Sequence, residues 1–340
     1  MITSHPEREI PNKEHTLAFI FSGQGSQWTN MGKRLLAREV VFRTSIEECE
    51  EAMRPYIDWS LLEQLTAPES RSRLEEIAYL QPILFALQVA LARLWISLGI
   101  RPDVVVGHSL GEIAAAHIAG VLSLRDAARI ICLRSLLLRR LSRQGAMAVV
   151  ELSLEQARQI LVGKEAWVSV AVSNSPIATV LSGDPLVLRE LLTTLEEQEI
   201  FWRSIKSDVA GHGPQVNPLL EELRTHLHGI KPQKASLPLY STVTTKVVTG
   251  PECDETYWAR NLREPVLFSS VIQHLVADDA PLFLEISPHP LLLNAIQQCV
   301  PEESAPVIAL PSLRRDEDER IVLLSTISAL YTAGYPATRE

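Results

Sequence analysis

The chain has 340 residues, of which 46% are hydrophobic and 21% are charged. This composition supplies the core of one large domain or two modest ones and excludes an intrinsically disordered polyelectrolyte. Acidic residues outnumber basic ones by 41 to 32, which gives a net charge of -9. That balance argues against sequence-independent binding to nucleic acid, because such binding needs cations to neutralise the phosphates.

The cysteines are far apart in the sequence, and none belongs to a CxxC motif or to a Cys/His pair with metal-ligand spacing. A disulfide scaffold and a structural zinc site are therefore unsupported. We expect no metal and a reduced, cytoplasmic setting. The four cysteines are Cys49, Cys132, Cys253 and Cys299.

Residues 1–15 are polar and have no apolar core of the kind that a signal peptide requires, so we expect a loose leader. The most apolar helix candidate, residues 77–92, stops at Arg93 before it reaches membrane-spanning length. At the other end, seven Ser, Thr, Gly or Pro residues interrupt the charge-free stretch 321–338, and we interpret residues 321–340 as a linker-like segment. We expect no membrane attachment.

Two buried strands open into glycine turns. Residues 16–21 form an apolar run that ends at Ser22-Gly23, and residues 104–106 form a second run that ends at Gly107. Helical periodicity follows each run, over residues 78–98 and 113–141. Strands that alternate with helices indicate an α/β fold with a mostly parallel sheet, in which sites lie at the carboxyl ends of the strands.

From residue 146 the pattern changes to β-α-β-β-α-β, the ferredoxin-like arrangement, within residues 146–206. We interpret this segment as an inserted small subdomain. The strand at 282–286 then completes the larger sheet, which takes up residues 16–145 and 207–320. The expected elements of the insert are strands at 146–152, 167–173, 178–182 and 201–205 and helices at 154–161 and 185–197.

Residues 107–111 read G-x-S-x-G, placed after an expected strand and before an Ala-rich helix. This is the context of a nucleophile elbow, in which small residues on both sides permit the strained turn that exposes the hydroxyl of Ser109. The helix N-terminus favours negative charge at the same place. A plain glycine turn between strand and helix is the alternative, but it does not explain the serine.

A nucleophilic serine needs a base, and three of the nine histidines are candidates. His212 lies in a glycine-rich loop just after the small subdomain, so this loop can place it over Ser109. His289 stands between two prolines, a context that favours a role in bracing a turn. His108 directly precedes the nucleophile, and its side chain should point away from that of Ser109.

The tetrahedral intermediate of acyl transfer needs two hydrogen-bond donors aimed at its oxyanion. The backbone N–H of Leu110, directly after the serine, is one expected donor. The glycine-rich loop 22–27 after the first strand is the expected source of the second. This loop lacks both the Lys-Ser/Thr ending of a P-loop and the G-x-G-x-x-G spacing.

Arg134 lies among residues that should face the core, so its charge must be paired. The sequence leaves two interpretations open. One is an internal salt bridge to a carboxylate, and the other is a bidentate binding site for the carboxylate of a substrate.

Taken together, these segments resemble the acyltransferase domains of modular polyketide synthases and, more distantly, malonyl-CoA:acyl carrier protein transacylases. The resemblance covers residues 19–335. It rests on ordered motifs at 21–28, 107–112, 181–184, 257–266 and 285–290. It implies an α/β-hydrolase-like large subdomain with an inserted ferredoxin-like subdomain.

Carried over residue by residue, the resemblance implies Ser109 as the nucleophile and His212 as the general base and acid. It implies an oxyanion hole made by the backbone N–H groups of Gln24 and Leu110, and Arg134 as the partner of a free carboxylate on the acyl unit. In that family a backbone carbonyl orients the histidine, and the corresponding positions here would be near 265–268. Asp208 is a possible substitute that the resemblance does not support.

The motif before the histidine is Val209-Ala210-Gly211-His212, which is neither the HAFH form associated with malonyl nor the YASH form associated with methylmalonyl. Val209, Gly211 and His108 are the candidate substrate-binding residues beside Arg134. Gly211 leaves more room than Phe or Ser, which favours methylmalonyl or ethylmalonyl. Leu110 resembles malonyl-type elbows instead.

We therefore expect a ping-pong acyltransferase that takes a dicarboxylic acyl unit from CoA and passes it to an acyl carrier protein in polyketide biosynthesis, without a cofactor. An acyl-carrier-protein hydrolase with the same Ser-His dyad, a donor that is itself a carrier protein and a non-catalytic docking module are the alternatives. The expected partners are acyl-CoA, the carrier protein and neighbouring synthase domains, with no nucleic acid and no membrane. A discrete protein and a domain of a larger synthase both stay open, and we favour the former.

Overall fold

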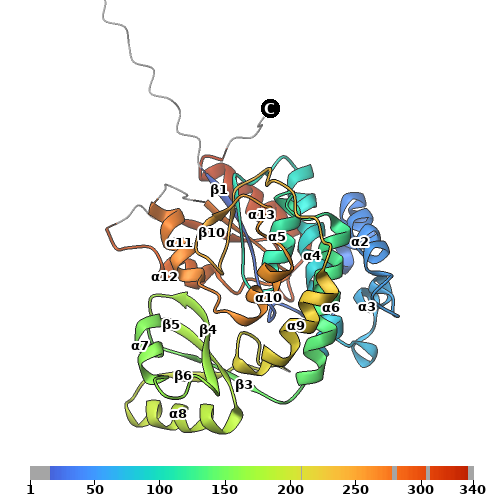
Figure 1. Cartoon of the computed structure of the whole chain (residues 1–340). Coiled ribbons are helices and arrows are strands. Elements are labelled where there is room, and N and C mark those ends of the chain that lie inside the picture. The colour runs from blue at the N-terminus through green and yellow to red at the C-terminus, as the bar shows by residue number, and fades with distance from the viewer. Residues whose placement is uncertain (1–15, 208, 278–281, 304–306, 336–340) are drawn as a thin grey trace, which may run out of the picture.

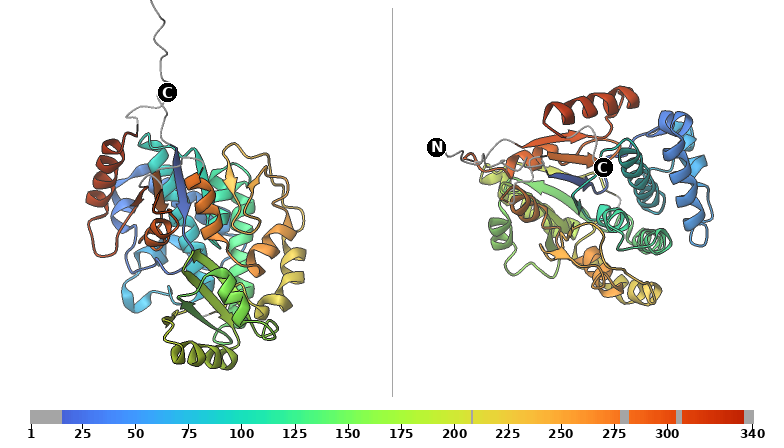
Figure 2. Two further views of the ribbon diagram at one scale, coloured as in Figure 1. Left: turned by 90° about the vertical axis from the view of Figure 1, so that its left-hand side faces the viewer. Right: turned by 90° about the horizontal axis from the view of Figure 1, so that it is seen from above.

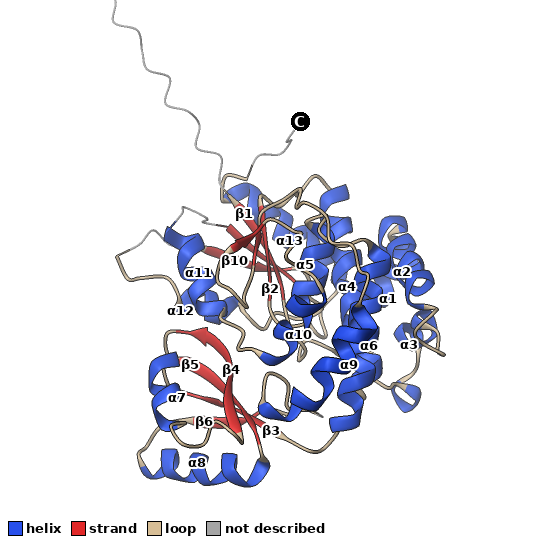
Figure 3. Ribbon diagram, in the orientation of Figure 1, coloured by secondary structure: helices blue, strands red, loops and turns tan. Residues whose placement is uncertain are grey.

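The computed structural model of the chain describes residues 16–207, 209–277, 282–303 and 307–335 (Figure 1). The expected leader 1–15 and Asp208 lie outside these residues. The described chain contains a large sheet surrounded by helices and a separate small sheet, which Figure 3 shows as two groups of strands. The α/β class and the mostly parallel large sheet are therefore confirmed.

The large sheet has six strands within the described residues, and all neighbours are parallel except the last pair. Its central strand β1 pairs with β2 on one side and β9 on the other, with Phe21 opposite both Gly107 and Ile286. In order across the sheet, the strands are β10 (Ile308–Pro311), β9 (Leu282–Ile286), β1 (Leu17–Phe21), β2 (Val104–Gly107), β7 (Leu239–Tyr240) and β8 (Val247–Val248).

Every residue of β1 is buried because helices cover both faces of the sheet. Leu17 and Phe19 belong to the core with α2, α4, α5 and α6, whereas Ala18 and Ile20 belong to the core with α11 and α12 on the opposite face. Figure 2 shows helices on both faces of the large sheet. The helices of this part are α1 (Lys33–Arg38), α2 (Val40–Met53), α3 (Leu61–Thr66), α4 (Ile77–Ser97), α5 (Gly111–Ile118), α6 (Leu124–Leu138), α9 (Leu220–Leu227), α10 (Glu255–Arg263), α11 (Phe268–Ala277), α12 (Leu293–Gln298) and α13 (Glu319–Thr332), with short 3-10 turns at Glu69–Arg71, Arg139–Leu141 and Pro214–Leu219.

Helix α4 agrees with the helical periodicity expected over residues 78–98, although its most apolar stretch was expected to stop at Arg93. It continues past Arg93 to Ser97, and its 21 residues are long and apolar enough to cross a membrane by length and composition. However, 94% of its most apolar window is buried inside the fold, against α2 and α6. Its apolar surface is thus that of a core helix.

The single helical pattern expected over 113–141 is divided into two helices, α5 and α6. Gly120 adopts φ 78° between them, a left-handed conformation that ends the first helix. The side chain of Ser123 then accepts a hydrogen bond from the backbone N–H of Asp126 and caps α6. The break turns α6 onto the side of the sheet where Arg134 faces the carboxyl end of β2.

The small sheet contains four antiparallel strands in the order β4-β5-β3-β6. This is the strand order of a ferredoxin-like β-α-β-β-α-β unit, and the elements follow the expected sequence. They are β3 (Ala146–Val150), α7 (Leu154–Ile160), β4 (Val168–Ser175), β5 (Ala178–Gly183), α8 (Pro185–Glu197) and β6 (Trp202–Ser204). The capping box of Ser153 and Gln156 and the Asp184 cap with Pro185 explain why both helices begin where they do.

The segment 321–340 is not linker-like as far as the structure describes it, because α13 extends to Thr332 and packs on the large subdomain. The carboxylate of Glu319 accepts hydrogen bonds from the backbone N–H groups of Gly32 and Leu35, at 2.7 and 2.9 Å. The hydroxyl of Thr326 donates to the carbonyl of Pro311. The small and hydroxyl residues that suggested a linker thus pack in a helix.

The two sheets meet where β4 lies beside the segment after α10. Val172 forms a parallel bridge with Val266, and the backbone N–H of Ser173 donates to the carbonyl of Val266 at 2.9 Å. In Figure 1 the small subdomain, in green, lies below the large sheet. This junction fixes the small subdomain beside the carboxyl ends of β1 and β2.

Candidate active site

A cavity of about 180 Å³ lies between the two subdomains. The loops after β1 and β2, helices α4 and α6 and the small sheet contribute to its wall, together with Ile205, Val209, Gly211 and His212. The predicted site residues that line it are Gln24, His108, Ser109, Arg134, Val209, Gly211 and His212. Leu110 directly follows Ser109, with its own side chain buried in the core.

Ser109 stands on a strained turn between β2 and α5. Its φ of 56° is a left-handed conformation, which costs about 1–2 kcal/mol for a residue with a side chain. Two glycines permit the turn, because a Cβ on Gly107 would lie 2.0 Å from Cα of Glu112 and one on Gly111 would lie 2.2 Å from the carbonyl oxygen of Phe21. This is the geometry of a nucleophile elbow, with the hydroxyl directed into the cavity.

His212 lies across the cavity from the elbow, with its Nε2 2.7 Å from Oγ of Ser109. Its Nδ1 is 2.9 Å from the backbone carbonyl oxygen of Glu264. A carbonyl only accepts, so Nδ1 carries the proton and Nε2 is free to accept from the serine hydroxyl. Ser109 and His212 form a dyad that a backbone carbonyl orients.

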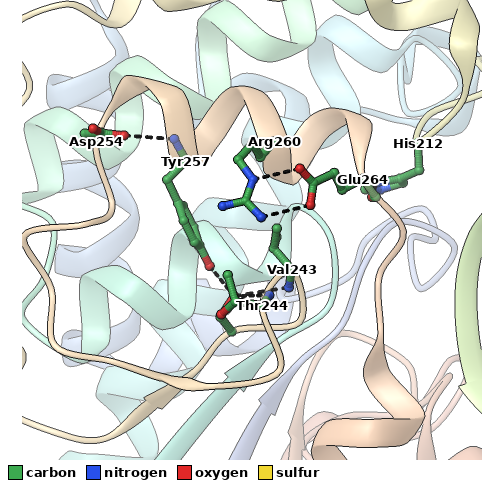
Figure 4. Close-up of polar contacts among 8 residues, drawn as sticks. His212, Val243, Thr244, Asp254, Tyr257, Arg260 and Glu264 are labelled. Carbon is green, nitrogen blue, oxygen red and sulfur yellow. Dashed lines mark hydrogen bonds and ion pairs between the residues drawn. The ribbon is translucent and has the colours of Figure 1, made fainter.

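The orienting carbonyl belongs to Glu264, the residue directly after α10 and one position before the range 265–268 expected from the sequence. Figure 4 shows Glu264 at this end of the helix, beside His212 and paired with Arg260. Arg260 Nε lies 2.7 Å from the Glu264 carboxylate. This ion pair fixes the residue whose carbonyl holds the imidazole.

Burial, reinforced by the positive charge of Arg134, lowers the pKa of His212 to about 3. Neutral imidazole is the form that can accept a proton from Ser109, so His212 stands ready as a base at physiological pH.

The two expected oxyanion donors come from neighbouring strands. The backbone N–H of His108 donates to the carbonyl of Phe21 at 2.8 Å, which holds the loop after β1 against the elbow. Among the described residues, neither the N–H of Gln24 nor that of Leu110 has a protein acceptor. The side chain of Gln24 is anchored, because its Nε2 donates to Oγ of Ser207 at 2.9 Å. Both amides are thus available to an oxyanion.

Arg134 is 3% exposed, and its guanidinium faces the nucleophile. One terminal nitrogen donates to Oδ1 of Asn261 at 2.6 Å and the other to Oγ of Ser109 at 3.0 Å. Its Nε is buried with no hydrogen-bond partner in the described part of the chain, and no described carboxylate lies within 4.0 Å. Of the two interpretations, the internal salt bridge is therefore absent from the described residues.

Burial lowers the pKa of Arg134 to about 10, and the nearby charge of Glu112 opposes this shift. The guanidinium still carries its charge at physiological pH. A buried cation with a spare donor, directed into a cavity, favours an anionic ligand.

The other two histidines have different surroundings. His108 lines the cavity, and its Nε2 lies 3.0 Å from Oδ1 of Asn174 in the small subdomain. Burial lowers the pKa of His108 to about 4. His289 accepts a hydrogen bond from the backbone N–H of Arg315 at 3.1 Å, so it braces a turn as expected.

The residues before His212 form the wall beside the dyad. Val209 is buried and lines the cavity. A Cβ added to Gly211 would have no atom within 4 Å, so the space next to this residue is open. Within the described residues, no three His, Cys, Asp or Glu side chains gather as metal ligands would. The groups assembled here can perform nucleophilic acyl transfer.

Comparison with known proteins agrees with this chemistry. Residues 18–335 match the family described as the acyl transferase domain. The chain belongs to this family. It is an acyltransferase of the kind found in modular polyketide synthases.

The acyltransferase is 44% identical over 319 residues to the spectinabilin polyketide synthase system protein NorA of Streptomyces orinoci, and this match covers 94% of the chain and 17% of that protein. It is 39% identical to the erythronolide synthase EryA2 of Saccharopolyspora erythraea, over 93% of the chain and 9% of that protein. The chain thus spans less than a fifth of the length of either synthase.

Among solved structures, the acyltransferase is similar to the acyltransferase domain from module 8 of the salinomycin polyketide synthase. The TM-score is 0.91 at 38% identity, and the alignment covers 95% of this chain and 78% of that one.

Sequence reasoning missed three polar residues around the site of the acyltransferase. Asn174 holds His108, while Asn261 and Glu112 lie behind Arg134. Two of them were inside motifs that had been noted, Glu112 directly after the elbow and Asn261 in the segment 257–266. Their signal was a polar side chain in an otherwise apolar helical face.

Proposed function

We propose that this acyltransferase moves a dicarboxylic acyl unit from a CoA thioester to the phosphopantetheine thiol of an acyl carrier protein, through an acyl ester on Ser109. The observation that carries the proposal is Arg134, a buried guanidinium with a spare donor beside the nucleophile. A cation in this position suits an acyl unit that has a second, free carboxylate.

In the first half-reaction, Oγ of Ser109 attacks the thioester carbonyl while Nε2 of His212 takes the hydroxyl proton. The oxyanion of the tetrahedral intermediate accepts hydrogen bonds from the backbone N–H groups of Gln24 and Leu110. The C–S bond then breaks, and His212 returns the proton to the departing CoA sulfur. An acyl ester on Ser109 and free CoA result.

The second half-reaction runs these steps in reverse with a new thiol. The phosphopantetheine thiol of the carrier protein gives its proton to His212, and its sulfur attacks the ester carbonyl. When the C–O bond breaks, His212 reprotonates Oγ of Ser109. The dyad returns to its starting state, so one histidine serves as base and acid in both directions.

Arg134 also separates this proposal from a hydrolase with the same dyad. A hydrolase that clears ordinary chains from carrier proteins has no use for a buried cation beside the ester. During transfer, the guanidinium holds the free carboxylate and so fixes the acyl unit relative to the dyad.

The cavity further supports acceptance of α-substituted malonyl units. Gly211 leaves open space where the HAFH form of the family has Phe, and Val209 replaces a larger first residue of the motif. We propose that methylmalonyl and ethylmalonyl units fit this space and that malonyl is tolerated.

Mass spectrometry of the intact protein tests the proposed function. The chain is mixed separately with malonyl-, methylmalonyl-, ethylmalonyl- and acetyl-CoA, and a phosphopantetheinylated carrier protein is then added. We expect a dicarboxylic acyl adduct on Ser109 that moves to the carrier protein. Loss of the adduct to water with no labelled carrier protein would favour the hydrolase, and preferential loading by acetyl-CoA would refute the dicarboxylic assignment.

A further inference from the structure

A buried polar network lies behind Arg134, and the proposed reaction steps do not use it. Its centre is the carboxylate of Glu112, which is 0% exposed. One oxygen accepts from the hydroxyl of Tyr257. The other accepts from the hydroxyl of Thr242 at 2.6 Å and from Nδ2 of Asn261 at 3.3 Å. Burial of a carboxylate costs free energy, and several donors are needed to offset that cost. The position of Glu112 therefore calls for a functional explanation.

Asn261 connects this carboxylate to the guanidinium. Its Oδ1 accepts from Arg134 at 2.6 Å, and its Nδ2 donates to Glu112. This orientation of the amide is fixed, because a flipped amide would direct its NH₂ group at the guanidinium and its oxygen at the carboxylate. Asn261 is 1% exposed, so water cannot substitute for either contact.

We propose that Asn261 and Glu112 are positioning residues that hold Arg134 toward the acyl unit and so set the preference for donors with a free carboxylate. This inference rests on the proposed function. Neither residue touches the acyl unit. They act through the guanidinium.

The amide between the two charges explains how Arg134 can be buried and still be available. A carboxylate in direct contact would occupy the guanidinium with a bidentate ion pair. With Asn261 in between, the charge of Glu112 still favours the charged form of Arg134, but a single terminal nitrogen is occupied. The other terminal nitrogen contacts Ser109, and Nε has no partner in the described residues. No carboxylate of the described residues occupies this edge, which leaves it to the carboxylate of the acyl unit.

Helix α10 links the network to the dyad. Tyr257 and Asn261 are four residues apart, so both side chains lie on one face of the helix, and Glu264 follows at its end. Figure 4 shows Tyr257 and Glu264 on this helix with His212 beside the latter. The hydroxyl of Tyr257 also lies 2.7 Å from Oγ of Ser241, from which it can accept a hydrogen bond. One helix therefore fixes both Arg134 and His212.

The test compares kcat/KM for malonyl-CoA and acetyl-CoA in transfer to the carrier protein. The variants are Arg134→Ala, Asn261→Ala, the isosteric Asn261→Asp and Glu112→Gln, and Tyr257→Phe as the matched control. Tyr257 contacts the same carboxylate on the oxygen that does not face Asn261, so its loss perturbs the network without touching the link to Arg134.

We expect Asn261→Asp and Glu112→Gln to lower the malonyl-to-acetyl ratio by about tenfold or more, the scale of one charge-assisted hydrogen bond. The loss should lie mainly in KM for malonyl-CoA. Asn261→Ala should lower the malonyl-to-acetyl ratio by a similar factor. Tyr257→Phe should lower the melting temperature and leave the ratio within about twofold, less than the loss of one neutral hydrogen bond.

The outcomes separate the two proposals. If Arg134→Ala itself leaves the ratio unchanged, the dicarboxylic function is wrong and the inference falls with it. If Arg134→Ala lowers the ratio but the isosteric variants act equally on both donors, as Tyr257→Phe does, the network is only structural and the inference alone is overturned. The isosteric variants keep the test valid if Asn261→Ala fails to fold.

Discussion

Ser109 and His212 are separated by 103 residues, yet both adopt φ 56° and their side chains meet at 2.7 Å. Residues other than glycine rarely adopt this left-handed conformation, so the surrounding packing must hold both. At Ser109, the close approach of neighbouring backbone atoms to Gly107 and Gly111 permits and holds the turn. At His212, the backbone N–H donates to the carbonyl of Leu262 at 3.2 Å and the carbonyl accepts from Oγ of Ser169 at 2.8 Å. Both subdomains thus position the base, and the dyad is preorganised.

Replacing Ser109 with Ala should abolish covalent acyl loading and leave the fold intact. No other nucleophile stands on the elbow, and the smaller side chain keeps the packing of the turn. Intact-protein mass spectrometry after incubation with acyl-CoA measures the adduct, and circular dichroism monitors the fold. A stable acyl-enzyme in this variant would show that another residue is the nucleophile.

His212→Ala should slow both half-reactions by about a hundredfold or more, in the range for loss of a general acid-base group. Single-turnover loading from CoA and unloading to the carrier protein measure the two steps separately. His289→Ala is the matched control, because His289 contacts Arg315 in a turn and should leave both rates nearly unchanged. Near-normal loading by the His212 variant would contradict the assignment.

Local sequence patterns predicted the elbow and the small subdomain. The glycine spacing of the elbow spans only a few residues. The helix caps and the strand alternation of the small subdomain are local in the same way, so the sequence alone shows them. The carbonyl that orients His212 was placed one residue too late, because every residue has such a carbonyl and only the end of α10 selects Glu264. Likewise, the contact of Glu112 with Asn261 joins residues 149 apart and has no local signature.

The prediction of a linker-like segment over residues 321–340 was wrong for a different reason. Helix α13 lacks the charged outer face that usually marks a helix in a sequence, and Ile321, Leu324 and Tyr331 are exposed on it. Its small hydroxyl residues resemble those of linkers. Long-range bonds, such as those from Gly32 to Glu319, stabilise it. Tertiary contacts here override local composition.

The buried histidines predict how stability depends on pH. The folded-state pKa values of His212 and His108 are lowered to about 3 and about 4 from 6.5. The unfolded chain therefore binds more protons below pH 6.5, so the stabilisation is complete above that pH and is lost progressively as the pH falls toward these values. The melting temperature should drop between pH 6.5 and 4 by more in the wild type than in a His108→Gln/His212→Gln variant. If the melting temperature falls equally with pH in the wild type and in the variant, the two histidines are not the source of the pH dependence.

Arg134→Ala should reduce the transition-state stabilisation of acyl loading from dicarboxylic donors by roughly 2 to 4 kcal/mol, the scale of a lost buried charge-assisted pair. Its preference should shift toward monocarboxylic donors, because an acetyl unit has no carboxylate for the guanidinium to hold. Competition between malonyl- and acetyl-CoA, measured by the mass of the Ser109 adduct, gives this difference directly. Equal losses for both donors would make Arg134 a structural residue.

Gly211 should decide how large an α-substituent the site accepts. A first side-chain carbon at this position meets no atom within 4 Å, so Gly211→Ala and Gly211→Phe should both fold while progressively filling the cavity. The wild type should load methylmalonyl and ethylmalonyl at least as well as malonyl. Each added methylene is worth only about 1 to 3 kcal/mol, so the preference should be graded rather than absolute.

The phenylalanine variant recreates the residue that the HAFH form has before the histidine. Loading of ethylmalonyl should fall most in this variant, loading of methylmalonyl should fall less, and loading of malonyl should be retained. The alanine variant should lie between it and the wild type. A competition among the three CoA esters, measured by the mass of the Ser109 adduct in each variant, tests the order. Exclusive malonyl loading by the wild type, unchanged in Gly211→Phe, would mean that Leu110 and the other walls of the cavity outweigh the space beside Gly211.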